Sequence, residues 1–383
     1  MDIRSRDAGA LLIATLALVA TGSPARAGFA YTVVDLGVAG SNSYANAINN
    51  NGQVVGGTDS PTSNGFYQAA LFSGGTVTNL GTLGGSGSNA SAINASGQIV
   101  GQGDQANLDS HGFSTTSKGG PATDLGTLQP GPGQTYSSAN AINNAGVIVG
   151  STNTSTFGIG HAFIQNFGGA MRDLSTMGLD STQSSQAFGI NNNGVIVGTT
   201  FIAGMSQTHA FVLDHGALSY LGDTNFASFA IGINDSGQVI GMTYTAKTPY
   251  QAFLYDPTSS KYTILGTLGG SGSAAYAINK SGVVVGDSDL SNGSHVPYVY
   301  QNGMMTDLNS LIAPGSNFAM LNDASGINDA GVIVGYGTRK DGTYGAYELI
   351  PQATVPEPGS LLLVGIGGLV TLGYTWRSRR RAA

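Results

Sequence analysis

The sequence predicts an all-β protein in which the 383-residue chain forms a seven-bladed β-propeller of four-stranded blades. Three short motifs each recur seven times, and the repeat length of 43 to 49 residues accommodates four strands and their turns. The composition agrees, with 60 glycines and only 9% charged residues. Glycine costs a helix about 1 kcal/mol relative to alanine, so this chain is a poor candidate for a helix bundle. The absence of cysteine excludes a disulfide scaffold and a thiolate metal site.

The N-terminal segment has the three parts of a secretory signal peptide. Basic residues such as Arg4 precede an apolar run at 8–21, and Ala25 and Ala27 supply the small residues of a signal peptidase site. We therefore expect residues 1–27 to be removed. The alternative is an uncleaved membrane anchor, but the apolar run is shorter than the roughly 20 residues that a spanning helix needs.

The first repeated motif is Ile-Asn-x-x-Gly followed by a short apolar run and a second glycine. It predicts a tight turn between two strands, because asparagine can cap its own backbone and glycine can adopt a left-handed conformation. A binding site would occur once, whereas this motif occurs in every repeat, so we interpret it as turn chemistry. The turn residues are Asn49 and Gly52, Asn94 and Gly97, Asn143 and Gly146, Asn191 and Gly194, Asn234 and Gly237, Asn279 and Gly282, and Asn328 and Gly331.

Two further motifs complete each unit. The third motif is a short strand that ends in leucine and a small or polar residue, as in Asp35-Leu36-Gly37. One unit thus contains strands near 91–94, 98–101, 111–115 and 121–125, which favours a propeller blade over the shorter coil of a parallel β-helix. The second motif, typified by His-Ala-Phe, lies 16 to 19 residues after each asparagine and begins at Gln68, His111, His161, His209, Gln251, His295 and Gly345.

The order of the motifs predicts how the ring closes. The first motif in the chain, at 31–37, is of the fourth-strand type, and the last, at 345–350, is of the third-strand type. Pairing the two would complete the last blade and cover both unpaired edges. The expected organisation is therefore one propeller domain at 28–352, with strands from about Tyr31 to Ile350, closed by the N-terminal strand.

The C-terminal segment at 353–383 carries a different signal. Pro356-Glu357-Pro358 precedes a predicted transmembrane helix at 361–376, and the arginines after this helix should remain cytoplasmic. This arrangement closely resembles the PEP-CTERM sorting signal of Gram-negative bacteria. The resemblance implies processing by an exosortase, a membrane protease of systems that accompany exopolysaccharide and biofilm genes; a plain tail anchor is the alternative. The terminal cluster consists of Arg377, Arg379, Arg380 and Arg381.

The repeats also resemble the extracellular HAF-repeat proteins of bacteria. The most faithful copies are at 124–128, at His161-Ala162-Phe163 and at 265–270. The resemblance implies an exported repeat protein of undefined role that often carries a PEP-CTERM tail. Three departures from the pattern raise doubt about local strand regularity: Gly345 in place of histidine, Pro297 in the sixth copy and Met177 after Ser175.

The four histidines of the second motif are the first candidate for a functional site. They share one register in the motif, so they could converge on a metal ion around the axis. Glutamine occupies the same place in other copies, which favours a structural residue that bonds to a neighbouring turn. The histidines are His111, His161, His209 and His295.

Acidic and aromatic residues offer weaker candidates. Asp287 with Asp289, or Asp104 with Asp109, could bind Ca²⁺ through loop oxygens, although solvated loop acids explain them as well. Loop aromatics, of which Tyr136, Tyr244 and Tyr250 are examples, could stack on sugars or pack in the core. We therefore expect no cofactor.

The function predicted from these observations is non-catalytic. The stretch at 28–354 holds 18 acidic and seven basic residues, a net charge of −11, which argues against nucleic-acid binding. No nucleophile elbow or His-Glu-x-x-His motif is present. We expect an exported binding or structural protein at the cell envelope or extracellular matrix, with a glycan or matrix partner. Signal peptidase and exosortase would be its partners during export. The alternative is a secreted propeller enzyme that cleaves glycosides.

Overall fold

The computed structural model describes residues 31–352, apart from short segments at 60–64, 117–119, 129–134, 155–158, 206, 224 and 247. The predicted signal peptide, the Pro-Glu-Pro segment, the C-terminal helix and the arginine cluster lie outside the described residues. Within the described part of the chain, no helix is both long and apolar enough to cross a membrane.

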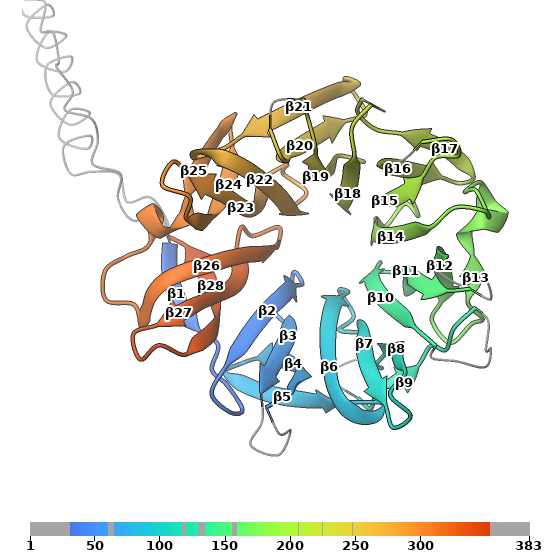
Figure 1. Ribbon diagram of the computed structural model, residues 1–383. Coiled ribbons are helices and arrows are strands. Elements are labelled where there is room, and N and C mark those ends of the chain that lie inside the picture. Colours follow the sequence, from blue (N-terminus) through green and yellow to red (C-terminus); the bar gives the residue numbers. More distant parts are fainter. Residues whose placement is uncertain are drawn as a thin grey trace, which may run out of the picture.

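Seven antiparallel sheets of four strands surround a central axis, which confirms the predicted seven-bladed propeller (Figure 1). Blades 1 and 2 consist of β2 (Ser43–Ile48), β3 (Val54–Asp59), β4 (Tyr67–Ser73), β5 (Thr76–Gly81), β6 (Gly84–Ile93), β7 (Ile99–Gln105), β8 (Ser110–Ser114) and β9 (Thr123–Asp124). Blades 3 and 4 consist of β10 (Ser137–Ile142), β11 (Val147–Asn153), β12 (Gly160–Asn166), β13 (Arg172–Asp173), β14 (Ser185–Ile190), β15 (Ile196–Phe201), β16 (Thr208–Asp214) and β17 (Ala217–Tyr220). Blades 5 and 6 consist of β18 (Ser228–Ile233), β19 (Val239–Thr243), β20 (Gln251–Asp256), β21 (Lys261–Gly266), β22 (Gly269–Ile278), β23 (Val284–Leu290), β24 (His295–Gln301) and β25 (Met304–Asp307).

Blade 7 closes the ring with a strand from the other end of the chain. It consists of β26 (Phe318–Ile327), β27 (Ile333–Arg339), β28 (Tyr344–Pro351) and β1 (Tyr31–Asp35). The antiparallel register of β1 on β28 runs from Tyr31 opposite Pro351 to Asp35 opposite Tyr347. The N-terminal strand thus takes the fourth-strand place in the last blade, at the position that the motif order predicts.

The repeated glycine in the second strand allows the first two strands of a blade to approach closely. A β-bulge interrupts the first strand of every blade, for example between Ala139 and Ala141. A Cβ atom on Gly150 would collide with the Ser138 carbonyl oxygen, and the equivalent glycines face the same obstacle. Only glycine fits beside the bulge, so the motif requires it here for space rather than for a left-handed backbone.

The core is divided among the interfaces between blades. Each of the seven buried apolar clusters in the described residues spans two adjacent blades, as where Val149 of blade 3 packs with Ile196 and Phe211 of blade 4. In blades 2 to 7 the third residue of the His-Ala-Phe motif is an aromatic residue that is fully buried in these clusters, whereas blade 1 has Ala70 there, and each such ring contributes about 1.5–3 kcal/mol of burial free energy.

The alternating strand directions give the ring two faces. The turns between the first and second strands of each blade lie on one side, which we call the turn face. The connections from the second to the third strand, and from each blade to the next, lie on the other side, which we call the loop face. Two of the blade-to-blade connections begin with short 3₁₀ helices, η1 (Leu174–Met177) and η2 (Leu308–Leu311). The side chain of Asp173 caps η1, so the departure at Met177 reflects a helical turn after the strand.

Candidate functional site

The seven repeated asparagines form a closed ring of hydrogen bonds on the turn face. In every blade the side-chain oxygen accepts two backbone N–H groups of its own turn, two and four residues later, and the glycine has φ between 74° and 81°. The side-chain Nδ2 donates to the carbonyl of the next blade's asparagine at 3.0–3.3 Å, and Asn328 returns to Asn49. This asparagine ring therefore shapes each turn and also links it to its neighbour.

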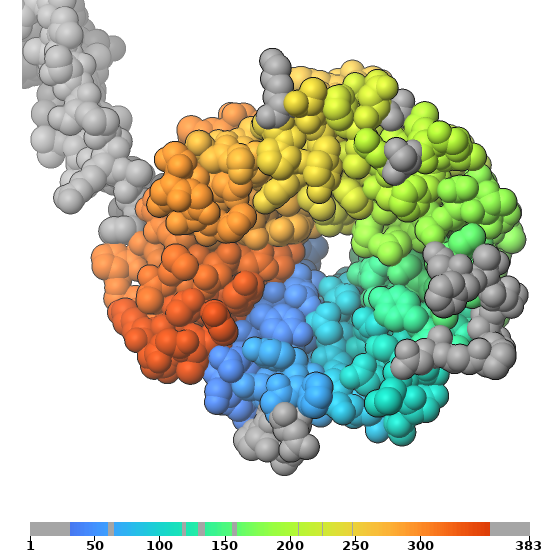
Figure 2. Space-filling view, viewed as in Figure 1, coloured from blue at the N-terminus to red at the C-terminus, as the bar shows by residue number. Residues whose placement is uncertain are grey.

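The asparagine ring surrounds the mouth of the central channel. The isoleucine–asparagine steps of all seven blades line a cavity of about 280 Å³ there, and Figure 2 shows the opening at the centre of the ring. The residues that follow the asparagines add further links, such as Asn144 N–H to Asn192 Oδ1 at 2.8 Å. Because these contacts recur around the ring, we interpret this mouth as structural.

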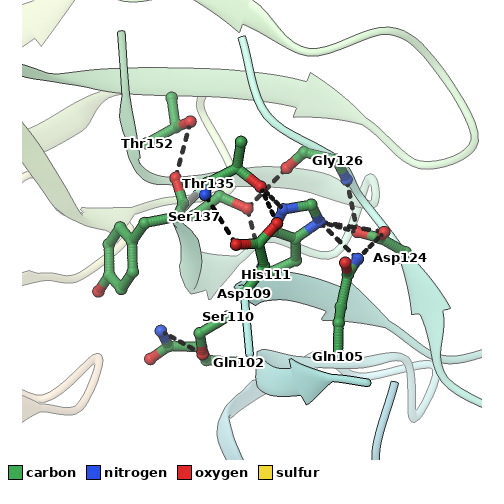
Figure 3. A network of polar contacts seen from close by, with 12 residues as sticks. Gln102, Gln105, Asp109, Ser110, His111, Asp124, Gly126, Thr135, Ser137 and Thr152 are labelled. Carbon is green, nitrogen blue, oxygen red and sulfur yellow. Dashed lines mark hydrogen bonds and ion pairs between the residues drawn. The ribbon is translucent and has the colours of Figure 1, made fainter. Parts of the chain in front are cut away.

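His111 illustrates what the histidine position does (Figure 3). Its Nδ1 lies 2.9 Å from Asp124 Oδ1 on the fourth strand, and its Nε2 lies 2.7 Å from Thr135 Oγ1 at the entry to blade 3. Carboxylate, imidazole and hydroxyl follow the order of a hydrolase triad. However, Thr135 Oγ1 donates to Asp109 Oδ2 at 2.7 Å, so its oxygen is left as an acceptor toward the imidazole. The network joins blade 2 to blade 3.

The other histidines do not converge on a common site. His161 contacts Asp173 of its own blade at 2.7 Å. His209 is buried opposite Thr200, and burial lowers its pKa. The prediction of one register for all four histidines is wrong at His295, which pairs with Asp289 one residue out of step, while Val296 takes the histidine position. His295 stands one residue before that position, where other copies have Gly160 and Thr208, so its side chain points to the other face of the strand, where it is exposed.

Arg339 takes the place of the histidine in blade 7. A Cβ on Gly345 would meet the Arg339 guanidinium, so the departure from the motif makes room for this side chain. The guanidinium donates to both carboxylate oxygens of Asp35, at 2.6 and 2.9 Å. Burial alone would raise the pKa of Asp35, but the bonds from Arg339 outweigh burial and hold this pKa below its ordinary value. The buried arginine thereby fixes β1 to the last blade.

The predicted calcium ligands are not brought together as pairs. Asp104 accepts bonds from Gly87 and Ser110, whereas Asp109 accepts bonds from Thr135. Asp289 contacts His295, whereas Asp287 faces blade 7. Across the described residues, no group of three or more histidine, aspartate or glutamate side chains is placed to hold a metal ion.

A serine clasp, which the sequence analysis missed, joins most neighbouring blades. The serine six residues before each asparagine accepts a backbone N–H from the third strand of the preceding blade, as from Ala162 to Ser185 at 3.0 Å. Six interfaces have this bond. At the interface of blades 6 and 7, Pro297 has no N–H to donate and Asn322 replaces the serine. The departure at Pro297 therefore leaves β24 intact and marks an unusual interface.

Two carboxyl groups meet at this same interface. Asp287 of β23 and Asp323 of β26 lie within hydrogen-bond distance of each other, and the Oδ1 of each has no other partner. Burial and the nearby Asp323 carboxyl raise the pKa of Asp287, and burial also raises that of Asp323. Like charges this close cannot both be ionised at little cost, so the pair holds one proton at neutral pH.

The acid pair occurs once in the ring. The residues equivalent to Asp287 and Asp323 in the other blades are all uncharged. Blades 6 and 7 also replace the buried phenylalanine of the motif with Tyr298 and Tyr347, and burial raises the pKa of both hydroxyls well above the ordinary value. By the criterion that a site occurs once, this interface is the candidate functional site.

Seven tyrosines extend from this interface across blades 5, 6, 7 and 1. Their rings contact one another in pairs, with centroids 6.5 Å apart for Tyr244 and Tyr250, 6.0 Å for Tyr336 and Tyr344, and 5.1 Å for Tyr44 and Tyr67. Tyr276 lies between the first two pairs. Burial raises its pKa, and the nearby groups raise it further, namely Asp287, Asp323, Tyr250 and Tyr336. Burial, Asp59 and the nearby Tyr344 raise the pKa of Tyr67, so the last two pairs are neighbours. We call this series the tyrosine strip.

Two members of the tyrosine strip reach the loop face. Tyr244 and Tyr344, at the loop-face ends of their strands, are 41% and 47% exposed. Such a surface offers flat apolar rings and hydroxyl groups to a ligand, together with one centre of negative charge. Tyr244 and Tyr250 are recognisable in the sequence as loop aromatics, but the other five are not, because the strip forms only when strands from four repeats are brought together.

Comparisons with known proteins support the predicted C-terminal sorting signal and the propeller fold. A model of the PEP-CTERM protein-sorting motif matches residues 354–381, which confirms the predicted sorting signal. This motif marks an exported protein that is membrane-anchored until an exosortase processes it. A family described as a protein of unknown function (DUF3466) matches residues 170–345, from the end of blade 3 into blade 7. No curated protein matches the chain.

Several solved structures share the propeller. A puromycin hydrolase is 13% identical with a TM-score of 0.58 over 84% of this chain and 55% of its own. A puromycin-hydrolyzing peptidase of Mycobacterium tuberculosis is 13% identical with a TM-score of 0.53, over 87% of this chain and 58% of its own. A prolyl endopeptidase is 10% identical with a TM-score of 0.50, over 85% and 51%. The chain spans about half the length of these peptidases, and the likeness shows the fold alone.

Proposed function

We propose that the propeller is a non-catalytic carbohydrate-binding module of an exported protein that is delivered to the cell surface or matrix. The observation that carries this proposal is the tyrosine strip, a series of tyrosines with Tyr244 and Tyr344 exposed at the loop face, which occurs once in an otherwise repetitive ring. Tyrosine rings stack on the apolar faces of sugars, and their hydroxyls bond to sugar hydroxyls. The PEP-CTERM motif supports an extracellular setting, where polysaccharides are available.

A glycan array probed with residues 28–354 tests the proposal. This part of the chain contains all seven blades and the closing strand, so it excludes only the two terminal signals. The double variant Tyr244→Ala, Tyr344→Ala should bind any glycan that is captured at least about tenfold more weakly, as expected when two exposed stacking rings are lost. The matched control is Phe167→Ala, which removes an aromatic side chain of similar exposure (39%) from the turn face. Equal binding by both variants, or no captured glycan, would argue against the strip as a carbohydrate site.

A secreted enzyme that cleaves polysaccharide is a second candidate, because carboxyl groups lie beside the aromatic strip. The carboxyl groups of a glycosidase flank the scissile bond, about 5 Å or more apart. Asp287 and Asp323 instead contact each other, so this activity requires the pair to separate. Release of reducing ends from a captured glycan, abolished by Asp323→Asn, would favour the enzyme.

A further inference from the structure

A small cavity opens at the loop-face end of the interface between blades 3 and 4, across the ring from the acid pair (Figure 1). Its volume is about 270 Å³, and no charged side chain of the described residues lines it. Small-molecule pockets begin at roughly 300 Å³, so this cavity has room for one sugar ring rather than for a longer segment. The residues that line it include Tyr136, Ser151, Gly160, Ser184 and Ser185.

The cavity depends on the glycine at position 160. In blades 1, 5 and 7 a tyrosine holds the same place, one residue before the His-Ala-Phe motif, namely Tyr67, Tyr250 and Tyr344. The ring of Tyr250 covers Gly272 of the following blade, since a Cβ on that glycine would meet it. In blade 3 no ring fills the equivalent space. A Cβ on Gly160 would meet only the Thr152 carbonyl oxygen, at an ordinary contact distance of 3.4 Å.

A buried hydroxyl group of blade 3 faces this cavity. Ala162, which lies opposite Ser151 in the strand register, packs with Ala187 of blade 4. Residues paired across two strands share a face of the sheet, so the Ser151 side chain also faces blade 4. Ser151 is only 7% exposed, and within the described part of the chain its hydroxyl has no hydrogen-bond partner. This hydroxyl is therefore free to bond to a ligand.

A second buried hydroxyl comes from the serine clasp of blade 4. The five other clasp serines each donate to a carbonyl after the preceding fourth strand, as Ser137 does to Gly126 at 2.6 Å. After blade 3 the helical turn η1 takes that place, and the Leu174 carbonyl accepts bonds from η1 itself and the residues after it. Ser185 is 2% exposed and accepts the clasp N–H, but no described residue accepts its hydroxyl hydrogen.

We propose that this cavity binds one neutral sugar ring, with an apolar face of the sugar on Tyr136 and sugar hydroxyl oxygens accepting bonds from Ser151 and Ser185. Tyr136 is 43% exposed, and tyrosine rings pack well on apolar surfaces while their hydroxyls stay in water. A charged sugar would lose hydration here without gaining an ion pair, because the lining is uncharged. The site is separate from the tyrosine strip, so it goes beyond the proposed function and does not depend on it.

Ligand-observed NMR titration of residues 28–354 with methyl glycosides tests this inference. The neutral probes are the methyl glycosides of glucose, galactose and mannose, and the charged probes are methyl glucuronide and methyl glucosaminide. At least one neutral probe should bind with a dissociation constant of about 1–10 mM, as expected for a ligand of this size. The charged probes should bind at least about tenfold more weakly. Equal affinity for neutral and charged probes would overturn the assignment.

Substitutions at the cavity locate the binding. Gly160→Tyr should abolish it, because the ring fills the space as Tyr250 does in blade 5. Gly160→Ala is the matched control, since one methyl group leaves most of the cavity open and should change the affinity by less than about threefold. Tyr136→Ala should weaken binding at least about fivefold. This residue is exposed, so its variant decides the question should Gly160→Tyr fail to fold.

The outcomes separate this cavity from the tyrosine strip. Binding of the neutral probe should persist in the double variant Tyr244→Ala, Tyr344→Ala. Its loss there, or its survival in both Gly160→Tyr and Tyr136→Ala, overturns the site between blades 3 and 4. Failure of every neutral probe to bind also overturns this site, and it leaves the strip to be judged by the glycan array.

Discussion

At the residue scale, each repeated asparagine serves two blades at once. In Asn191 the side-chain oxygen accepts the N–H groups of Asn193 and Val195, while Nδ2 donates to the Asn234 carbonyl at 3.1 Å. Serine or aspartate could cap the turn, but neither supplies the N–H donor that reaches the next blade. This double role explains why the same residue type is required in all seven repeats.

Replacing Asn191 by alanine should therefore cost about 3 kcal/mol of unfolding free energy, since three partly or fully buried hydrogen bonds lose one partner. Asn193→Ala is the control, because its exposed side chain makes only a single bond to the Asp235 carbonyl. That change should stay within about 0.5 kcal/mol. Urea unfolding of both variants measures the difference. Similar midpoints would show that the link between blades contributes little.

The acid pair predicts a pH dependence of stability that an ordinary surface aspartate does not give. The pKa of Asp287 is raised in the folded protein, so between its unfolded value near 4 and its folded value the native state binds more protons than the unfolded state. Stability from this pair is therefore lost as pH rises through that window. Asp287→Asn should unfold at a higher temperature than wild type at pH 8 to 9, with the gain vanishing toward about pH 4. A constant difference at all pH values would contradict the shared proton.

At the element scale, the sequence predicts strand order well and side-chain register less well. The four strands per repeat and the pairing of β1 with β28 both follow from motif order, because neighbouring strands in a blade are also neighbours in sequence. His295 shows the weakness of motif matching, since a histidine one residue before the motif position has its side chain on the opposite face of β24. Gly345 shows another, because the side chain that replaces histidine comes from β27 rather than from the same strand.

The Arg339–Asp35 pair predicts how firmly the closing strand is held. Arg339→Met keeps the apolar stem but leaves the Asp35 carboxylate without its bidentate partner. We expect a loss of about 2 kcal/mol, less than for a fully buried pair because 24% of the Asp35 side chain is exposed. Lys280→Met provides the control, since it breaks an exposed contact of 3.7 Å to Asp329 and should change stability by under about 0.5 kcal/mol. Thermal unfolding of the two variants measures the difference. Equal losses of stability would show that the Arg339–Asp35 pair contributes no more than a surface ion pair.

At the scale of the whole molecule, the repeats explain the scaffold and the departures from them identify the site. The turn asparagines and the second-strand glycines can be recognised in one sequence because each occurs seven times, and the missed serine could have been found in the same way, since it recurs six times at a fixed distance before the asparagine. The tyrosine strip cannot, since its members come from repeats 43 to 49 residues apart and hold different places in the motif. Asp323 shows the same limit: nothing in its local sequence indicates that it faces Asp287, and only comparison of the seven repeats with one another reveals both as exceptions.

Closure by a single N-terminal strand makes the ring a cooperative unit, and removing that strand tests this directly. Deleting residues 28–37 leaves the edge of β28 unpaired and removes Asp35 from Arg339. An exposed, unpaired strand edge favours association with other chains, so the truncated protein should form oligomers and unfold over a broader temperature range. Deleting residues 353–383 is the control, because all four strands of blade 7 then remain. A synthetic peptide of residues 29–40 should restore the sharp transition by refilling the fourth-strand position. A truncated protein that stays monomeric and melts as sharply as the control would show that the blades are stable without ring closure.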